Sequence, residues 1–217
     1  MMTKQLFFDF DGTVADSERG TVRAVKYCVE QMKLKPLTET DYRSFIGPTI
    51  YDSLAHFYPE LTQADINHGA DLFHDYYREV SLFDLTIYPR FLETMTTLKE
   101  AGFQLNLASA KIQAQLDRLV AHFALDQYFT GVYGAIPDAM KKPAILAVGI
   151  ADTGVDPKEA LMVGDREMDV EGGHANHVPV IGVTYGFGSR EELVAHRADV
   201  IVDRPTEIIE AVQKLID

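Results

Sequence analysis

Apolar residues recur along the chain in two patterns, and the change between them divides the sequence into two kinds of region. Over residues 103–202, short apolar runs alternate with stretches of helical spacing, which predicts β-α units and a parallel sheet. The apolar runs predict six strands: Leu6–Phe10, Phe103–Ala108, Val132–Gly134, Leu161–Val163, Val180–Val183 and Val200–Val202. Pro89 and Gly102 bracket one predicted helix, and Pro205 opens the last one.

Residues 15–85 follow a helical pattern. Apolar stripes within 22–32 and 66–80 repeat every three or four residues, and no segment reads convincingly as a strand. Thr62 followed by Asp65 resembles a capping box, which marks a helix start. We therefore expect an α/β core of residues 1–14 and 86–217, interrupted after its first strand by an all-helical insertion of residues 15–85. One continuous α/β domain is the alternative.

Composition narrows the classes of function. The 217 residues are 47% hydrophobic and 24% charged, which is typical of a folded globular protein. A net charge of −13 argues against a nucleic-acid surface, which needs clustered Lys and Arg, but allows a small positive pocket for an anion. The one cysteine, Cys28, excludes an internal disulfide framework.

The same pattern gives expectations about location and assembly. No stretch approaches the roughly 18 apolar residues that span a bilayer, so we expect no membrane contact. The first apolar run, Leu6–Phe8, ends after three residues, and no secretory signal is visible. We expect a cytoplasmic protein. A monomer is compatible with the sequence.

The first candidate for chemistry is the segment Phe8-Asp9-Phe10-Asp11-Gly12-Thr13. Side chains on a strand alternate between faces, so Asp9 and Asp11 project from one face at a strand end. Ligands of open α/β sheets bind at the carboxyl ends of strands. Two carboxylates there repel each other unless a cation lies between them or one is protonated. Gly12 permits close approach of the backbone.

A second acidic pair, Asp165 and Asp169, follows the predicted strand Leu161–Val163. Four residues separate the two, which places them on the same helical face if a helix starts at Asp165. Acidic residues at a helix N-terminus also serve as caps, which is the structural alternative. Two strand-end acidic pairs in one domain favour a shared cation, and oxygen-only ligands of this kind suit Mg²⁺.

A hydroxyl and a lysine complete the candidate site. Ser109 ends the predicted strand Phe103–Ala108, and its hydroxyl with neighbouring backbone N–H groups could hold an oxyanion. Lys141 and Lys142 precede a predicted helix, and on composition either one could supply a fixed positive charge.

In this order, Asp9-x-Asp11-Gly-Thr, Ser109, Lys142 and Gly-Asp165-x-x-x-Asp169 resemble the four motifs of the haloacid dehalogenase superfamily. The resemblance covers nearly the whole chain and implies a Rossmann-like core with an inserted helical cap, as in phosphoglycolate phosphatase-like members. The segment 186–193, Gly-Phe-Gly-Ser-Arg-Glu-Glu-Leu, also looks like the segment that follows the fourth motif in that subgroup. Ala110 departs from the second motif, where Asn or Ser is usual.

The resemblance implies a Mg²⁺-dependent phosphatase that acts on a small phosphomonoester. Asp9 would be the nucleophile, and Asp11 the acid and base. The implied metal site uses Asp9, the backbone carbonyl of Asp11, Asp165 and Asp169. Lys142, which fits the third motif better than Lys141, would hold the phosphoryl oxygens together with Ser109 and the backbone at Gly12 and Ala110.

Three alternatives share parts of this pattern. A phosphomutase of the same superfamily has all four motifs, and a dehalogenase of that superfamily lacks the acid at Asp11. A receiver-like signalling protein also uses strand-end carboxylates but is about half as long. The substrate stays open among phosphoglycolate, a nucleoside monophosphate and a sugar phosphate. Arg43 is a candidate contact for a substrate carboxylate or phosphate.

Overall fold

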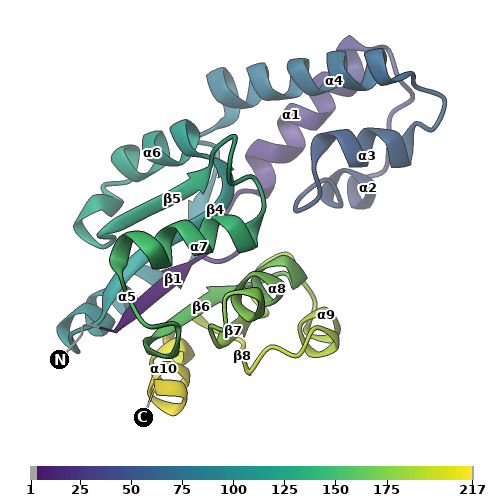
Figure 1. Cartoon of the computed structure of the whole chain (residues 1–217). Helices are drawn as coiled ribbons and strands as arrows, with labels where there is room; N and C mark the ends of the chain where they lie inside the picture. Colours follow the sequence, from purple (N-terminus) through teal and green to yellow (C-terminus); the bar gives the residue numbers. More distant parts are fainter. Residues whose placement is uncertain (1–3, 217) are drawn as a thin grey trace. The chain divides into compact units, whose positions relative to one another are not determined.

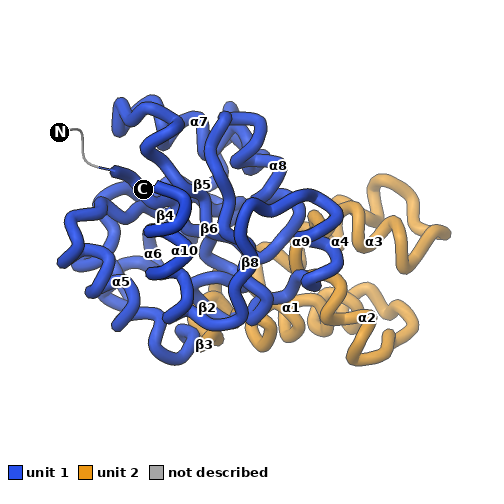
Figure 2. Tube along the Cα trace, turned by 90° about the horizontal axis from the view of Figure 1, so that it is seen from below, with its two compact units in different colours: residues 1–16, 87–217 blue, residues 17–86 orange. Residues whose placement is uncertain are grey.

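A computed structural model describes residues 4–216 and divides the chain into two compact units (Figure 2). Unit 1 comprises residues 1–16 and 87–217, and unit 2 is Ser17–Thr86. Two short strands, β2 (Ala15–Asp16) and β3 (Thr86–Ile87), lie where the chain passes between the units and form a two-stranded sheet.

Unit 1 is built on a six-stranded sheet in the order β5-β4-β1-β6-β7-β8, and its strand pairs are parallel (Figure 1). The strands are β1 (Gln5–Phe8), β4 (Gln104–Ile112), β5 (Gly131–Ala135), β6 (Ala160–Gly164), β7 (Val180–Val183) and β8 (Val200–Val202). The predicted α/β fold class is confirmed. The last two strands have the predicted bounds, whereas β1 ends two residues earlier than expected, before Asp9.

Helices flank this sheet. They are α5 (Phe91–Glu100), α6 (Gln113–His122), α7 (Lys142–Thr153), α8 (Glu167–Ala175), α9 (Arg190–Ala195) and α10 (Ile208–Ile216), with 3₁₀ turns at Leu125–Gln127, Pro157–Glu159 and Pro205–Glu207. Crossovers between parallel strands are right-handed, so connections running toward β5 and toward β8 place their helices on opposite faces. Accordingly the crossover helices α7 and α8 pack on each other, and α10, which follows the last strand, packs on α5. None of the described helices is long and apolar enough to cross a membrane.

The helix ends test the predicted stop and start signals. Gly102 follows α5 with φ +94°, a conformation that favours glycine, as its predicted role at a helix end requires. The start is later than Pro89 predicts, because Arg90 adopts a left-handed conformation (φ 64°) and the helix begins at Phe91. Pro205 opens a 3₁₀ turn that leads into α10.

The core of unit 1 explains why its strands read as continuous apolar runs. Every residue of β1, β6 and β7 is buried, as expected for parallel strands covered on both faces. Phe7, Met162 and Val180, one from each strand, belong to a single apolar cluster with residues of α7 and α8. On the opposite face the ring of Phe8 packs edge-on against Phe91 of α5, so the sheet is held from both faces.

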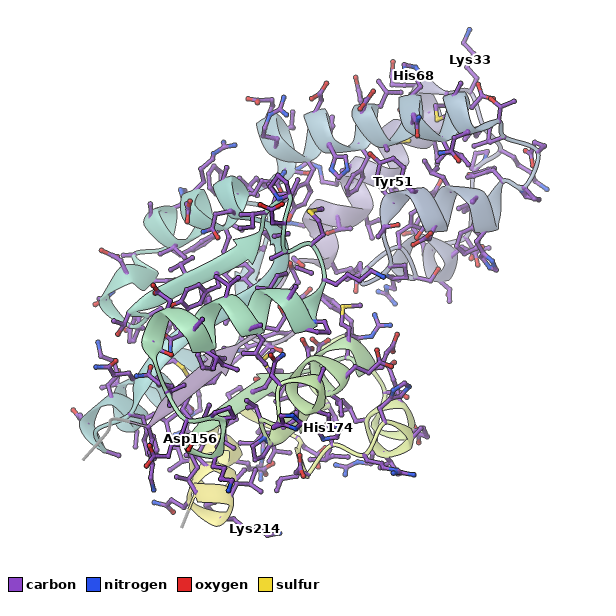
Figure 3. The ribbon with its side chains drawn as sticks, in the orientation of Figure 1. Lys33, Tyr51, His68, Asp156, His174 and Lys214 are labelled. Carbon is purple, nitrogen blue, oxygen red and sulfur yellow. The ribbon has the colours of Figure 1, made fainter. Side chains whose placement is uncertain are left out.

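Unit 2 is helical between residues 17 and 85. Its elements are α1 (Glu18–Gln31), α2 (Glu39–Arg43), α3 (Ile50–Phe57), α4 (Gln63–Tyr76) and a π-helical turn, Tyr77–Ser81. Their apolar faces form a core of their own around Cys28, Leu54 and Ala70. Tyr51 and His68, labelled in Figure 3, are exposed.

The capping box predicted at the start of α4 is present. The Asp65 N–H donates to Thr62 Oγ1 over 3.2 Å, and the Thr62 N–H donates to Asp65 Oδ2 over 3.0 Å. Thr62→Ala removes one of these two bonds, so we expect the free energy of unfolding to fall by about 1 kcal/mol in urea denaturation. Thr97→Ala, on an exposed helix surface, is the control and should change it by less. Equal effects of the two substitutions would contradict the capping role.

Candidate active site

The predicted site residues of unit 1 gather where the chain order of the sheet reverses. Strand β1 is central, with β4 on one side and β6 on the other, and Phe8 is level with Leu107 and with Val163. Asp9 therefore emerges at the same edge of the sheet as Ser109 and Asp165. Such a switch point is where open α/β sheets bind ligands.

Asp9 and Asp169 share one buried lysine. Lys142 Nζ lies 2.6 Å from Asp9 Oδ1 and 2.8 Å from Asp169 Oδ1, and it donates a hydrogen bond of 2.8 Å to the Ala108 carbonyl. All three charged side chains are nearly inaccessible to solvent. Lys141, the other candidate from sequence, is exposed at the N-cap of α7. The geometry thus selects Lys142 as the cation at Asp9.

Asp165 is fixed by backbone N–H groups of the segment after β7. Its Oδ2 accepts hydrogen bonds from Phe187 N at 2.7 Å and from Gly188 N at 3.3 Å. Two glycines make this possible: a Cβ on Gly188 would lie 1.9 Å from the Asp165 carbonyl oxygen, and a Cβ on Gly12 would lie 2.2 Å from Asp165 Oδ2. The φ of Gly12 is +82°, which also favours glycine.

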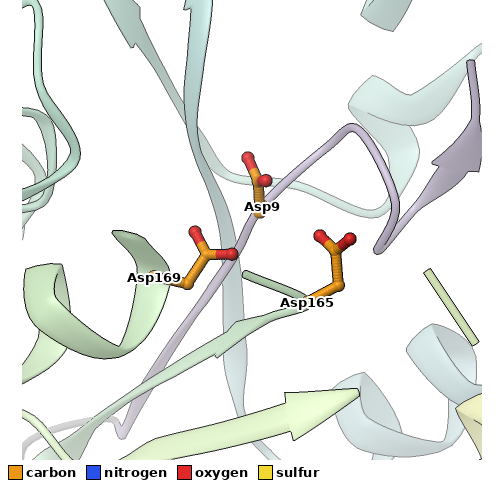
Figure 4. A group of neighbouring side chains, drawn as sticks. All are labelled: Asp9, Asp165 and Asp169. Carbon is orange, nitrogen blue, oxygen red and sulfur yellow. The ribbon is translucent and has the colours of Figure 1, made fainter. Parts of the chain in front are cut away.

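Asp169 closes the first turn of α8. Its Oδ2 accepts a hydrogen bond from Arg166 N at 3.1 Å, so one oxygen caps the helix while the other contacts Lys142. The helix begins at Glu167, after Asp165. A shared helical face was expected only if a helix started at Asp165, so the two aspartates do not share one. Asp165 directly follows β6, and Asp169 lies on α8. Figure 4 shows their carboxylates and that of Asp9 around a common space.

Burial and like charges set the electrostatics of this cluster. Burial raises the pKa of Asp9 to about 6, in spite of the lowering effect of Lys142. Burial, followed by the charges of Asp169 and Asp9, raises the pKa of Asp165 well above its usual value. For Lys142, burial alone would lower the pKa, but the charges of Asp169 and Asp9 outweigh it and raise the pKa. The single positive charge of Lys142 therefore does not balance the negative charges of the three buried carboxylates.

The cluster fits a divalent cation bound by oxygen. Asp9, Asp165 and Asp169 each offer a carboxylate oxygen, and these three atoms lie within 4.8 Å of one another. Among the described residues no other group of His, Cys, Asp or Glu meets that condition. The Oδ1 atoms of Asp9 and Asp169 accept no well-aligned hydrogen bond within the described part of the chain, although both contact Lys142. A set of oxygen donors without nitrogen or sulfur is what Mg²⁺ prefers.

Asp11 pairs with a lysine that the sequence analysis did not select. Lys111 Nζ lies 3.1 Å from Asp11 Oδ2. The Lys111 N–H also donates to Ser109 Oγ over 3.3 Å, and Ser109 is buried. Because Lys111 follows Ser109 by two residues, strand alternation could have placed it on the same face of β4, toward the site. The neighbouring Ala110 is exposed.

Glu192 of α9 accepts hydrogen bonds at 2.8 Å from Arg166 Nε and from the Glu167 N–H, so it ties α9 to the start of α8. The spacing of Glu192 from Asp165 gives no sequence signal for this contact.

Arg43 belongs to unit 2, where its side chain pairs with Glu18 Oε1 at 2.6 Å, and its role at the site stays a prediction.

The shared lysine leads to a stability prediction. Lys142→Met leaves Asp9 and Asp169 buried without their cation, so we expect the free energy of unfolding in EDTA to fall by about 3–5 kcal/mol. Lys141→Met is the matched control, because its side chain is exposed and should change stability by about 0.5 kcal/mol or less. Urea denaturation measures both variants. A loss for Lys142→Met no larger than that of the control would contradict the ion-pair assignment.

Comparison with known proteins identifies the family to which the chain belongs. Residues 6–183 match the model of the family described as haloacid dehalogenase-like hydrolase. Among curated relatives, a 5'-nucleotidase of Pseudomonas aeruginosa is 28% identical (88% of this chain, 87% of the relative). A phosphoglycolate phosphatase of Vibrio vulnificus is 27% identical over 96% of both chains. A tyrosine-protein kinase of Mycobacterium tuberculosis, PtkA, is 30% identical (94% of this chain, 67% of the relative).

A solved structure gives the same result for the fold. The structure titled as a predicted phosphatase from Clostridium acetobutylicum superposes with a TM-score of 0.90 at 29% identity, over 99% of this chain and all of that one. The family, fold class and enzyme class expected from the sequence are thereby confirmed. With a family match that runs from the first strand of the sheet through β7, the chain belongs to the haloacid dehalogenase-like hydrolases.

Proposed function

We propose that the protein is a Mg²⁺-dependent phosphatase that hydrolyses a small phosphomonoester through a phosphoaspartate at Asp9. The observation that carries this proposal is the buried Asp9 carboxylate, which contacts Lys142 and clusters with the carboxylates of Asp165 and Asp169. Asp11 follows two residues further on. The relatives named 5'-nucleotidase and phosphoglycolate phosphatase support the choice of a phosphate ester as substrate.

The first half of the reaction transfers the phosphoryl group to the chain. An Asp9 oxygen forms a bond to phosphorus while the bond from phosphorus to the ester oxygen breaks. The departing oxygen keeps the bonding electrons and takes a proton from the carboxyl group of Asp11, which leaves Asp11 as a carboxylate. The products of this half are the free alcohol and a phosphoaspartate.

The second half regenerates the enzyme with water. The Asp11 carboxylate takes a proton from a water molecule as the water oxygen bonds to phosphorus, and the bond between phosphorus and Asp9 breaks. Asp9 returns as a carboxylate and Asp11 as a carboxylic acid. The sum is ester plus water giving alcohol plus phosphate, so Asp11 acts first as acid and then as base.

Fixed charge makes the attack possible. A carboxylate and one phosphate charge about 4 Å apart repel by about 4 kcal/mol at an effective dielectric constant of about 20. Lys142, which already contacts Asp9, offsets part of this repulsion, and the Ser109 hydroxyl with backbone N–H groups at Gly12 and Ala110 holds the transferred oxygens. Mg²⁺ bound by Asp9, the Asp11 carbonyl, Asp165 and Asp169 would supply the remaining positive charge at the phosphoryl group.

Unit 2 has the role of a cap in this proposal, and it selects the leaving group. We assign the contacts with the leaving group to Arg43 and to residues 47–49, which lead into α3, while the core holds the phosphoryl group. The expected cytoplasmic location stays a prediction. Transfer of the phosphoryl group to a second substrate, as in a phosphomutase or in the relative named as a tyrosine-protein kinase, is the competing outcome, and assays of phosphate release separate it from hydrolysis.

Substitution of Asp9 and of Asp11 should distinguish the roles proposed for the two residues. Asp9→Asn removes the attacking oxygen, so we expect phosphate release from a panel of phosphomonoesters with Mg²⁺ to fall by about 1,000-fold or more. Asp11→Asn should lose activity but keep its affinity for Mg²⁺, since it contributes only a backbone carbonyl to the metal.

Titration calorimetry with Mg²⁺ supplies the comparison, with Asp165→Asn as the variant that should bind the metal weakly. Retention of a tenth of the wild-type rate by Asp9→Asn would exclude covalent catalysis at that residue. An affinity for Mg²⁺ lowered equally in Asp11→Asn and Asp165→Asn would contradict the role given to Asp11.

The cap role predicts a change of specificity. Gly47 has φ +110° and does not tolerate a bulky residue without strain, so the exposed neighbour Pro48 is the better position. Pro48→Tyr should alter relative kcat/KM among phosphomonoesters while sparing p-nitrophenyl phosphate, whose leaving group needs little help. Glu60→Tyr, at another exposed position of unit 2, is the control. The same fractional loss on every substrate would show that the loop is only structural.

A further inference from the structure

Lys111 contacts a proposed catalytic group and is not used in the reaction described above. It lies on β4, its ammonium is 3.1 Å from Asp11 Oδ2, and only 7% of its side chain is exposed. The other buried lysine of the site, Lys142, is already surrounded by Asp9, Asp169 and the Ala108 carbonyl. The two lysines therefore serve different ends of the site: Lys142 the phosphoryl end, and Lys111 the end where Asp11 meets the departing oxygen.

The site has more acidic than basic side chains, so a cation near Asp11 can stabilise a leaving group with a negative charge. Asp9, Asp11, Asp165 and Asp169 supply four carboxylates, against the two ammonium groups of Lys111 and Lys142. In the proposed reaction Asp11 becomes a carboxylate as it gives its proton to the departing oxygen, and this new negative charge repels a leaving group that carries its own negative charge. Lys111 places an opposite charge where that repulsion arises, and its near-complete burial strengthens the interaction relative to one in water.

The distances allow the Lys111 ammonium to contact the leaving group directly. To donate its proton, Asp11 must come within about 3 Å of the departing oxygen. Since Lys111 Nζ is 3.1 Å from the Asp11 carboxylate, the ammonium lies within about 6 Å of that oxygen. A carboxylate or phosphate attached one or two bonds from the ester oxygen falls inside this range, whereas the distal part of a large neutral leaving group extends beyond it.

We propose that Lys111 binds a negative charge on the leaving group, and that the preferred substrates are small phosphate esters or anhydrides whose leaving group is a carboxylate or a phosphate. This inference rests on the proposed phosphatase function and specifies its substrate class. It favours short anionic leaving groups over nucleosides and neutral sugars. Lys111 is then a specificity-determining residue, in addition to pairing with Asp11.

The test compares two esters that differ only in charge. Both 2-phosphoglycolate and 2-hydroxyethyl phosphate have the same chain length, but only the first has a carboxylate on its leaving group; inorganic pyrophosphate tests a phosphate leaving group. We measure kcat/KM for the three compounds in the wild type, Lys111→Met, Lys111→Arg and, as an unrelated exposed lysine, Lys158→Met. Circular dichroism of each variant establishes that it is folded.

The ratio of kcat/KM between anionic and neutral leaving groups is the readout, because loss of Lys111 also alters its partner Asp11 and changes every rate. We expect Lys111→Met to lower this ratio by about thirtyfold, the size of a charge-assisted contact, and Lys111→Arg to retain most of it. Lys158→Met should keep the wild-type ratio. The anionic compound with the larger change identifies carboxylate or phosphate as the preferred charge.

Two results would overturn the inference, and they differ in what they say about the proposed function. An equal loss of kcat/KM on all three compounds in Lys111→Met would mean that Lys111 only positions Asp11, and the phosphatase proposal would stand. A wild type that hydrolyses none of the three compounds in the presence of Mg²⁺ would overturn the substrate class. If it also released no phosphate from p-nitrophenyl phosphate, the phosphatase proposal would fail with it.

Discussion

The ammonium group of Lys142, held between Asp9 and Asp169, is the interaction on which the rest of the site depends. Three aspartates cannot be buried at one sheet edge without positive charge, because each carboxylate loses its hydration and repels the other two. Lys142 supplies part of that charge from the first residue of α7. The remaining deficit is what makes the cluster receptive to a divalent cation and, with it, to a phosphoryl group.

The fold supplies the geometry for this interaction through strand order. Because β1 is central, it lies between β4 and β6, and three neighbouring strands contribute to the site: Asp9 follows β1, Ser109 lies within β4 and Asp165 follows β6. Close packing then fixes the side chains. Gly164 is an example: a Cβ at this position would lie 2.2 Å from Asp169 Cγ, so the strand end and the helix start can meet only where the residue is glycine.

The sequence predicted the elements that repeat a simple pattern. Fully buried strands such as Val180–Val183 appear as apolar runs, and residues that directly follow such strands, Asp9 and Asp165, could be recognised as candidates. Contacts that depend on the third dimension could not. Glu192 reaches the start of α8 from another helix, and the pairing of Lys111 with Asp11 joins a residue of β4 to one in the segment after β1, 100 positions earlier. Composition alone left Lys141 and Lys142 open, the resemblance favoured Lys142, and the start of α7 at Lys142 brings its side chain to Asp9.

Covalent transfer to Asp9 is the central claim, and direct trapping tests it. Wild-type protein mixed with excess 2-phosphoglycolate and Mg²⁺ is quenched in acid during turnover, reduced with borohydride and mapped by peptide mass spectrometry. A phosphoaspartate is reduced to homoserine, so the account predicts homoserine at position 9 and none at position 11. Conversion at Asp11 or at another aspartate, or turnover with no modified aspartate at any quench time, would contradict the account.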